Sequence, residues 1–361
     1  MTGNPTILPG QRIRARGAES NRVGRFEPTD REAFDDGWDM AEEDRLVATE
    51  VRLERPRSAL TFNRSPDVPF DRSINPYRGC EHGCIYCFAR PSHAWLNLSP
   101  GLDFETRLIA RPGIAGVLDS ELRRPAYRVA PVAIGTNTDP YQPIEARYRI
   151  TREVLELCLE VRHPVIITTK SDRVLADLDL LEQMARLDLV GVGISVTSLD
   201  PGLSRLLEPR AASPAKRLDA LARLVEAGVP AHVSIAPVIP AITDEYIEAI
   251  LSASAARGVR SASWIFLRLP HEVAPLFREW LETHFPDRAT KVMSIVRAVR
   301  GGRDNDPRFG SRMKPQGVWA ELYRRRFRLA CQRHGIDEER QLPLDCSQFR
   351  KPDLSGQLRL L

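Results

Sequence analysis

The chain has 361 residues, enough for one large domain or two modest ones with a sizeable buried core. Its hydrophobic content of 42% and charged content of 28% are typical of globular proteins, and a net charge of +4 does not by itself indicate nucleic-acid binding. No apolar run approaches the ~18 residues that a membrane-spanning helix needs, and the basic N-terminus lacks the apolar core of a secretory signal. We therefore expect a cytoplasmic protein with no membrane partner.

The cysteine usage does not fit a secreted disulfide framework, which would be denser and usually belong to a smaller protein. Three cysteines fall within eight residues, and Cys158, Cys331 and Cys346 are scattered singly. We expect Cys158 and Cys331 to be buried core thiols. Three close cysteines in a reducing compartment indicate ligands of a metal or a cluster.

Residues 1–65 are expected to form an irregular N-terminal extension. A basic arm comes first, with Arg12, Arg14, Arg16, Arg22 and Arg25, and an acidic patch follows between residues 35 and 44. Such a segment either packs on the domain or stays solvated, and its arginines leave open a contact with nucleic acid or substrate.

The core domain is expected over residues 66–300, where short β-branched runs alternate with amphipathic stretches. Predicted strands are 73–76, 131–136, 164–170, 189–197, 231–237 and 261–269, and predicted helices between them are 113–123, 143–162, 172–186, 214–227 and 243–257. Runs such as VIITT and LVGVGISV are apolar on both faces, as strands of a covered parallel sheet should be. Six such units predict an α/β fold, a partial (β/α)6 TIM-like barrel with its chemistry at the carboxyl ends of the strands.

Residues 301–361 are expected to form a C-terminal loop and helical extension. Two helices are predicted at the end of the core domain, at 271–284 and 287–300, and one in the extension, at 315–334. Residues 301–315 between them are rich in Gly, Asp, Arg and Pro, which predicts a long loop or lid.

The three clustered cysteines lie in the segment NPYRGCEHGCIYCFAR, residues 75–90, as Cys80, Cys84 and Cys87. A structural zinc site normally has four ligands in two pairs, and no second cysteine pair exists here. Zinc remains an alternative if His82 or His93 supplies a fourth ligand. Three thiolates on one tight loop suit a cubane cluster that keeps one iron free of protein ligands.

This segment resembles the signature of the radical SAM superfamily, C-x3-C-x-aromatic-C, with Tyr86 at the aromatic position. The resemblance implies that Cys80, Cys84 and Cys87 bind a [4Fe-4S] cluster whose fourth iron holds S-adenosylmethionine (SAM). It also implies radical catalysis through a 5′-deoxyadenosyl radical, started by a reductant such as flavodoxin or ferredoxin. Over roughly residues 70–300 the chain is similar to the spore photoproduct lyase-like (DNA repair photolyase-like) branch.

Members of that branch hold SAM with polar residues after the second, third and fourth strands. The matching stretches here are GTNTDPYQPIE (135–145), ITTKSD (167–172) and GISVTSLD (193–200). The resemblance therefore implies cofactor contacts from Tyr86, Asn137 or Thr138, Lys170 and Ser195.

The residues themselves agree with this assignment but leave alternatives open. Lys170 ends an apolar strand, so its ammonium can reach the barrel mouth and pair with a carboxylate. An exposed strand-end lysine and a satisfied core hydroxyl are the alternatives for Lys170 and Ser195. Asp139, which precedes Pro140, is read equally well as a turn residue.

A photoproduct lyase also has to return a hydrogen atom to its substrate radical. The branch uses a cysteine at the end of the second strand and tyrosines beside the cluster loop. The matching positions here hold Thr136 and Phe88, which are poor hydrogen-atom donors. Cys346 is the other thiol considered, as one that approaches the barrel mouth from elsewhere in the chain, but photoproduct lyase activity is not predicted.

Three functions therefore remain open. The first is a radical SAM enzyme acting on nucleic acid, consistent with the basic arm and with Arg297, Arg300 and Arg303. The second is a radical SAM enzyme acting on a small molecule or a protein. The third is a non-catalytic zinc-binding module.

Overall fold

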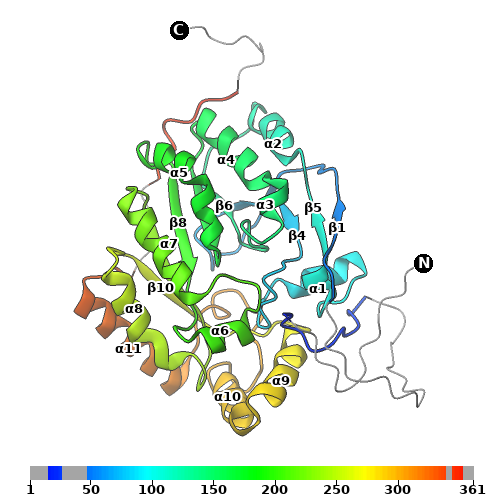
Figure 1. Ribbon diagram of the computed structural model, residues 1–361, viewed down its shortest axis with the longest axis vertical. Helices are drawn as coiled ribbons and strands as arrows, with labels where there is room; N and C mark the ends of the chain where they lie inside the picture. The colour runs from blue at the N-terminus through cyan, green and yellow to red at the C-terminus, as the bar shows by residue number, and fades with distance from the viewer. Residues whose placement is uncertain (1–14, 27–46, 339–343, 353–361) are drawn as a thin grey trace.

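The computed structural model describes residues 15–26, 47–338 and 344–352 (Figure 1). Its main sheet has seven strands in the order β10-β9-β8-β7-β6-β3-β2. All neighbouring pairs are parallel except β2 with β3, so β2 is an antiparallel edge strand. The strand bounds are β2 (Leu60–Phe62), β3 (Arg72–Ile74), β6 (Val132–Ile134), β7 (Val165–Thr169), β8 (Val190–Ser195), β9 (Ala231–Val238) and β10 (Ala262–Phe266). The six parallel strands confirm the predicted partial (β/α)6 barrel.

Helices connect these strands and cover the outer face of the sheet (Figure 1). They are α2 (Ile114–Leu122), α3 (Glu145–Tyr148), α4 (Ile150–Glu160), η2 (Asp172–Asp177), α5 (Leu178–Ala185), α6 (Pro201–Leu207), α7 (Pro214–Glu226), η3 (Asp244–Tyr246) and α8 (Ile247–Ala255). Helix α7 shows how the sequence specifies them. Ser213 caps it by accepting a hydrogen bond from the Lys216 N–H, and Pro214 occupies its first turn. Leu218, Leu221 and Leu224 form its buried stripe.

One predicted helix, 143–162, is broken into α3 and α4. The break falls at Arg149, whose φ of 51° is left-handed. The buried Glu145 carboxylate stabilises this break, because it accepts hydrogen bonds from the N–H groups of Thr151 (2.9 Å) and Arg152 (3.4 Å). The hydrophobic periodicity of residues 143–162 did not reveal that Glu145, a residue of α3, caps the start of α4.

A second, three-stranded sheet lies beside the barrel, and the sequence did not predict it. Its order is β1 (Glu50–Leu53), β5 (Arg107–Ala110) and β4 (Tyr77–Arg78). Helices η1 (Arg90–Leu96) and α1 (Asp103–Thr106) lie between β4 and β5 in the chain. Residues 1–65 are therefore not wholly irregular, since β1 and β2 fall there. These strands have two to four residues, too few for a clear alternating pattern.

The described part of the basic arm packs on the domain. Arg16 is buried and donates to the backbone oxygen of Glu105 (2.9 Å), while Arg22 and Arg25 pair with Glu279 and Glu272. Arg12, Arg14 and the acidic patch lie outside the described residues. Arg16, Arg22 and Arg25 thus act as packing residues rather than as a free nucleic-acid arm.

The C-terminal part adds α9 (Val273–His284), α10 (Pro286–Ala298) and α11 (Gly317–His334), close to the predicted bounds. Between α10 and α11 runs the predicted long loop. Helix α11 packs against α8 through the ion pair of Arg326 with Glu248 (2.7 Å). No helix in the described ranges has the length and apolar character needed to cross a bilayer.

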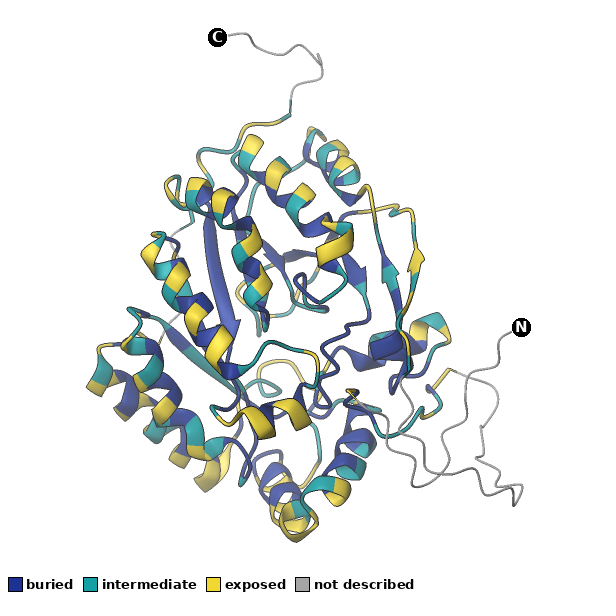
Figure 2. Ribbon diagram, in the orientation of Figure 1, coloured by how far each residue is buried: buried dark blue, intermediate teal, exposed yellow. Residues whose placement is uncertain are grey.

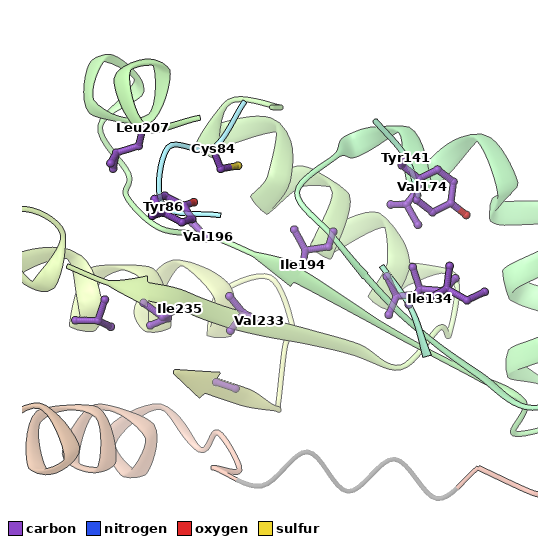
Figure 3. Packing of buried hydrophobic residues seen from close by; sticks show 14 of the residues in the cluster. Cys84, Tyr86, Ile134, Tyr141, Val174, Ile194, Val196, Leu207, Val233 and Ile235 are labelled. Atoms are coloured by element: carbon purple, nitrogen blue, oxygen red, sulfur yellow. The ribbon is translucent and has the colours of Figure 1, made fainter. Parts of the chain in front are cut away.

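The core fills the space between the sheet and its helices, with buried faces turned inward and exposed residues on the outer helix faces (Figure 2). Figure 3 shows that Cys84 and Tyr86 lie over the carboxyl end of β8, above Ile194 and Val233 in the barrel interior. Cys158 and Cys331 are free and buried in this core, as predicted. The barrel is therefore a packed body with its open end beneath the cysteine loop.

Candidate active site

A cavity of about 1480 Å³ opens at the carboxyl ends of the strands. All eight residues assigned from the sequence line it: Cys80, Cys84, Cys87, Tyr86, Asn137, Thr138, Lys170 and Ser195. They come from the loop after β4 and from the ends of β6, β7 and β8. The fold thus brings residues more than 100 positions apart in the sequence around one space.

The cysteine loop is shaped by its own backbone and by two glycines. The N–H of Cys80 donates to Phe104 O (2.9 Å), and the N–H of Cys87 donates to Cys84 O (3.2 Å). Gly83 has a φ of 67°, and a Cβ there would lie 2.7 Å from the Glu105 Oε2 atom. Gly79, at φ 76°, is similarly enclosed. A side chain at either position would push the loop away from its support.

A buried ion pair beneath the loop fixes its path. Arg90 donates to Cys84 O (2.9 Å) and Gly83 O (3.1 Å), and its guanidinium pairs with Glu105 at 2.5 Å. Glu105 also accepts the backbone N–H groups of Gly17 and Ala18, both at 2.9 Å. Neither partner of the Arg90–Glu105 pair is exposed, so this anchor is strong only while both charges are present.

The donor set fits a cluster better than one zinc ion. Across the described ranges, no three His, Cys, Asp or Glu side chains are grouped to hold a single metal ion. His82 faces Asp139 (3.3 Å), and His93 Nε2 lies 3.0 Å from Arg107 O. The two candidate zinc histidines are therefore engaged elsewhere. A cubane instead takes thiolates on three different irons, which suits cysteines spread around a loop.

Burial and a neighbouring ammonium act in opposite directions on thiols of the cysteine loop. Burial raises the pKa of Cys80, Cys84 and Cys87, while the Lys170 ammonium partly lowers the pKa of Cys84 and Cys87. Thiolates in such surroundings are stable only with metal bound, since ligation deprotonates them. Ligation to a metal centre would therefore hold these cysteines as thiolates.

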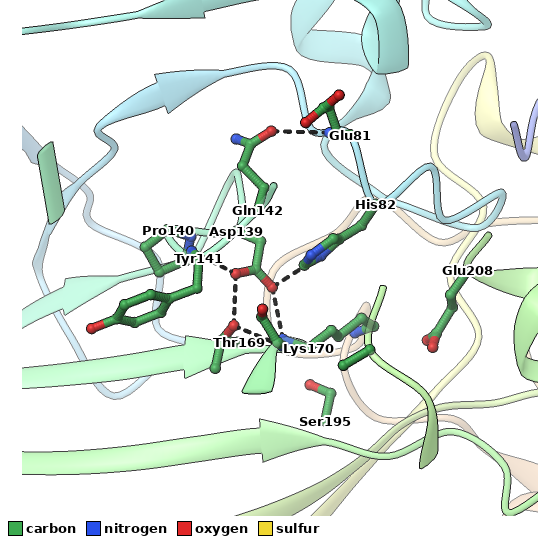
Figure 4. Close-up of polar contacts among 12 residues, drawn as sticks. Glu81, His82, Asp139, Pro140, Tyr141, Gln142, Thr169, Lys170, Ser195 and Glu208 are labelled. Atoms are coloured by element: carbon green, nitrogen blue, oxygen red, sulfur yellow. Dashed lines mark hydrogen bonds and ion pairs between the residues drawn. The ribbon is translucent and has the colours of Figure 1, made fainter. Parts of the chain in front are cut away.

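Asp139 joins the cysteine loop to the strand ends (Figure 4). Its carboxylate accepts hydrogen bonds from the Thr169 hydroxyl (2.7 Å), the Lys170 N–H (2.7 Å) and the Tyr141 N–H (2.9 Å), and it faces His82. Burial alone would raise the pKa of Asp139, but His82 and these donors outweigh it and hold the pKa at about 2. The local turn proposed from the sequence is present, and Asp139 also bridges three segments.

A second buried network holds Tyr86, and sequence reasoning missed it. The Tyr86 hydroxyl donates to Glu208, which also accepts from Thr197 (2.8 Å) and pairs with Arg217. Burial would raise the pKa of Glu208, but the Arg217 and Lys170 charges hold it at about 2. Glu208 and Arg217 belong to no motif, so nothing in the sequence connects them to the site.

The predicted cofactor residues differ in how free their side chains are. The Thr138 hydroxyl donates to Tyr77 O (2.9 Å), which ties it to β4. The Lys170 ammonium lies 5.9 Å from the centre of the Tyr86 ring. Ser195 lines the cavity at the end of β8, and Figure 4 shows it facing the same space as Lys170. Among the described residues, the Asn137 side-chain amide has no hydrogen-bond partner, so Asn137 is freer than Thr138 to meet a ligand.

The residues considered for hydrogen return are separated by the fold. Thr136 and Phe88 both line the cavity, where the sequence comparison placed them. Cys346 does not line the cavity. The backbone N–H of its neighbour Asp345 donates to Asp188 O (2.8 Å), next to the amino end of β8. The expectation that Cys346 might reach the mouth was wrong, because the tail packs on the opposite end of the barrel.

Comparison with known proteins agrees with this site. A family model described as the radical SAM superfamily matches residues 74–253, which include the three cysteines and the strands from β4 to β9. An uncharacterised protein of Mycobacterium bovis is 37% identical over 246 residues, covering 67% of this chain and 72% of the relative. The chain belongs to the radical SAM superfamily. Enzymes of this superfamily use a [4Fe-4S] cluster and SAM, and they need a reductant and a substrate.

Two further proteins are similar to this chain, one in its structure and one in its sequence. A mutant of spore photoproduct lyase has a TM-score of 0.57 at 15% identity, covering 79% of this chain and 80% of its own, which supports the shared fold. A protein of Pseudomonas phage M6, named radical SAM Nα-GlyT isomerase, is 25% identical over 224 residues, covering 61% of this chain and 44% of the phage protein. The likeness to spore photoproduct lyase confirms the predicted fold.

Proposed function

We propose that this radical SAM enzyme abstracts a hydrogen atom from a nucleic-acid substrate. One observation carries the proposal: the cavity that holds the three cysteines is also lined by arginines and by exposed phenylalanines. The arginines are Arg55, Arg57, Arg78, Arg111, Arg268 and Arg312, against Glu54 and Asp139 as the acidic lining residues. Cationic side chains bind phosphates, and exposed aromatic faces stack on bases.

The aromatic contribution comes from Phe62 and Phe88, which are 62% and 54% exposed. Exposed aromatic faces at a cavity wall are available to stack on the bases of a nucleic acid. By contrast, Arg300 is buried and Arg297 pairs with Asp304, so neither supports nucleic-acid binding as the sequence suggested. The proposal therefore rests on the cavity arginines and not on Arg297 or Arg300.

The cofactor roles follow from the site. Cys80, Cys84 and Cys87 would hold the cluster, and Tyr86, Asn137, Lys170 and Ser195 would contact SAM, with Thr138 supporting them. When bound, the cluster and SAM together supply reductive cleavage of SAM to methionine and a 5′-deoxyadenosyl radical. The Lys170 ammonium suits the SAM carboxylate, and the Asn137 amide suits a polar end of the cofactor. The electron would come from a small one-electron carrier such as flavodoxin or ferredoxin.

The reaction outcome differs from photoproduct cleavage. Among the described residues that line the cavity, the cysteines are the three of the loop. The hydroxyl groups of the lining tyrosines, Tyr77 and Tyr86, already donate to the buried carboxylates of Glu145 and Glu208. A free thiol that could return a hydrogen atom is therefore lacking at Thr136 and nearby. The proposal therefore stops at hydrogen abstraction and does not extend to photoproduct cleavage.

Isotope transfer tests the substrate. The reconstituted chain is incubated anaerobically with SAM, dithionite and perdeuterated single-stranded DNA or RNA, and 5′-deoxyadenosine is analysed by mass spectrometry. Deuterium in the 5′-deoxyadenosine supports a nucleic-acid substrate, and Cys84→Ala should form none. Unlabelled 5′-deoxyadenosine with every oligonucleotide would leave the radical chemistry intact and point instead to a small molecule or a protein.

A further inference from the structure

Arg268 lies two residues after β10, in the wall of the active-site cavity. Among the described residues its guanidinium contacts no oxygen acceptor. Nη1 lies 3.0 Å from the Met313 sulfur, a weak acceptor, and Nε is buried without a hydrogen-bond partner. This half-buried cation is therefore left without a counter-charge of its own.

The acidic groups nearby are already paired. Asp67 accepts from Arg312 Nε (2.7 Å) and from the Gly310 N–H (2.7 Å), and Asp306 pairs with Arg308 (2.9 Å). Burial, followed by the Arg312 charge, lowers the pKa of Arg268. The carboxylates around Arg268 thus serve other arginines.

A neighbouring arginine adds to this excess of positive charge. Arg300 is buried, and among the described residues its hydrogen bonds go to two backbone oxygens, those of Leu267 (3.2 Å) and Arg312 (2.6 Å). Burial and the charge of Arg268 lower the pKa of Arg300 to about 10. Within the described part of the chain neither guanidinium group is hydrogen-bonded to a carboxylate, although the charges of Asp67 and Asp306 act on them. Two neighbouring cations held in this way favour a bound anion.

The segment that carries Met313 spans the open side of the barrel. Arg312 Nη2 binds the Ser65 hydroxyl (2.6 Å), and Arg312 Nε binds Asp67, so the chain after α10 is tied to the connection between β2 and β3. Arg268 faces the cavity at this gap between β10 and β2. An oxyanion that entered here would replace the Met313 sulfur as partner of the guanidinium.

We propose that Arg268, backed by Arg300 and bordered by Met313, is a phosphate-binding subsite that positions a phosphodiester of the substrate. The planar guanidinium offers two parallel N–H groups that match two phosphate oxygens. The subsite rests on the proposed function for the identity of the ligand, since that function supplies the phosphodiester. Its basis in the fold, a guanidinium in the cavity wall with no hydrogen-bonded carboxylate among the described residues, is independent of the substrate.

The test measures binding by the reconstituted full chain. A 5′-fluorescein single-stranded DNA dodecamer is followed by fluorescence anisotropy, and inorganic tripolyphosphate is followed by calorimetry. Arg268→Met should weaken binding of the dodecamer about tenfold and lower the slope of log affinity against log salt by about 1. Arg268→Lys, which keeps the charge but not the two parallel N–H groups, should recover part of the affinity. Arg328→Met is the matched control, since Arg328 is exposed on α11 away from the cavity.

Thermal unfolding of each variant separates folding from binding, and Arg268→Lys keeps the test valid if Arg268→Met does not fold. Equal binding of both probes by wild type and folded Arg268 variants overturns the subsite, as does failure of the wild type to bind either probe. Tripolyphosphate binding that depends on Arg268, without dodecamer binding, supports the subsite and contradicts a nucleic-acid substrate.

Discussion

The two sides of the active-site cavity are built in opposite ways. Around the cysteine loop, buried charges are matched, as in the pairs Arg90–Glu105 and Arg217–Glu208. At the gap between β10 and β2, Arg268 has no hydrogen-bonded carboxylate among the described residues, and Phe62 is exposed. Matched charges fix a geometry before any ligand arrives, whereas unmatched ones are completed by a ligand. The comparison indicates a rigid cofactor side and a receptive substrate side.

The largest expected effect comes from breaking a matched pair. Arg217→Met leaves the Glu208 carboxylate buried without its partner and should lower the free energy of unfolding by about 3–5 kcal/mol. Arg324→Met removes the exposed pair with Glu321 and should cost about 0–1 kcal/mol. Urea unfolding followed by circular dichroism measures both. Similar losses in the two variants would contradict the rigid cofactor side.

A pH profile probes the same side through His93, which lies against Gly79 at the start of the loop. Burial lowers the pKa of His93 to about 4, below the ordinary value of 6.5. Between pH 4 and 6.5 the unfolded chain therefore binds more protons than the folded chain. The contribution of His93 to the free energy of unfolding is complete above pH 6.5 and is lost as the pH falls toward 4. The loss should approach about 3 kcal/mol.

The measurement is urea unfolding between pH 4 and 7 for wild type and His93→Gln. The variant should show a flatter pH dependence, and the difference between the two chains cancels the opposite effect of Glu145, whose pKa burial raises to about 7. His271→Gln, at an exposed position, is the control. Parallel curves for wild type and His93→Gln would show that the loop support tolerates a charge.

A smaller effect separates two glycines with similar backbone angles. Gly83 (φ 67°) is packed against Glu105, whereas a Cβ at Gly310 (φ 84°) would meet nothing within 4 Å. Gly310→Ala should cost only the left-handed strain, about 1 kcal/mol, while Gly83→Ala should cost at least about 2 kcal/mol. Gly83→Ala should also reduce iron content after reconstitution. Equal costs would mean that the loop is not held against its support.

The sequence revealed the parts of this protein whose signals are local. The spacing of Cys80, Cys84 and Cys87 is read directly, and runs that are apolar on both faces located the parallel strands, because buried strands need no alternation. The family resemblance pointed to Lys170 and Ser195, and their position at the ends of such runs agreed with it, because polar residues there can face the barrel mouth.

The missed parts depend on contacts between distant segments. The sheet of β1, β5 and β4 has strands too short to show a period, and its order links residues 50–110. The pair of Glu208 with Arg217 and the unpaired state of Arg268 are properties of the folded chain, since charge alone does not tell which partner an arginine finds. The break at Arg149 depends on a carboxylate that caps the following helix.

The central claim is that Cys80, Cys84 and Cys87 hold a [4Fe-4S] cluster that cleaves SAM. Anaerobic reconstitution, followed by iron and sulfide analysis and by assay of 5′-deoxyadenosine with SAM and dithionite, tests it most directly. We expect about four irons and four sulfides per chain and 5′-deoxyadenosine from wild type, with neither a full cluster nor product from Cys84→Ala. Zinc without sulfide, or no 5′-deoxyadenosine from the loaded wild type, would contradict the account.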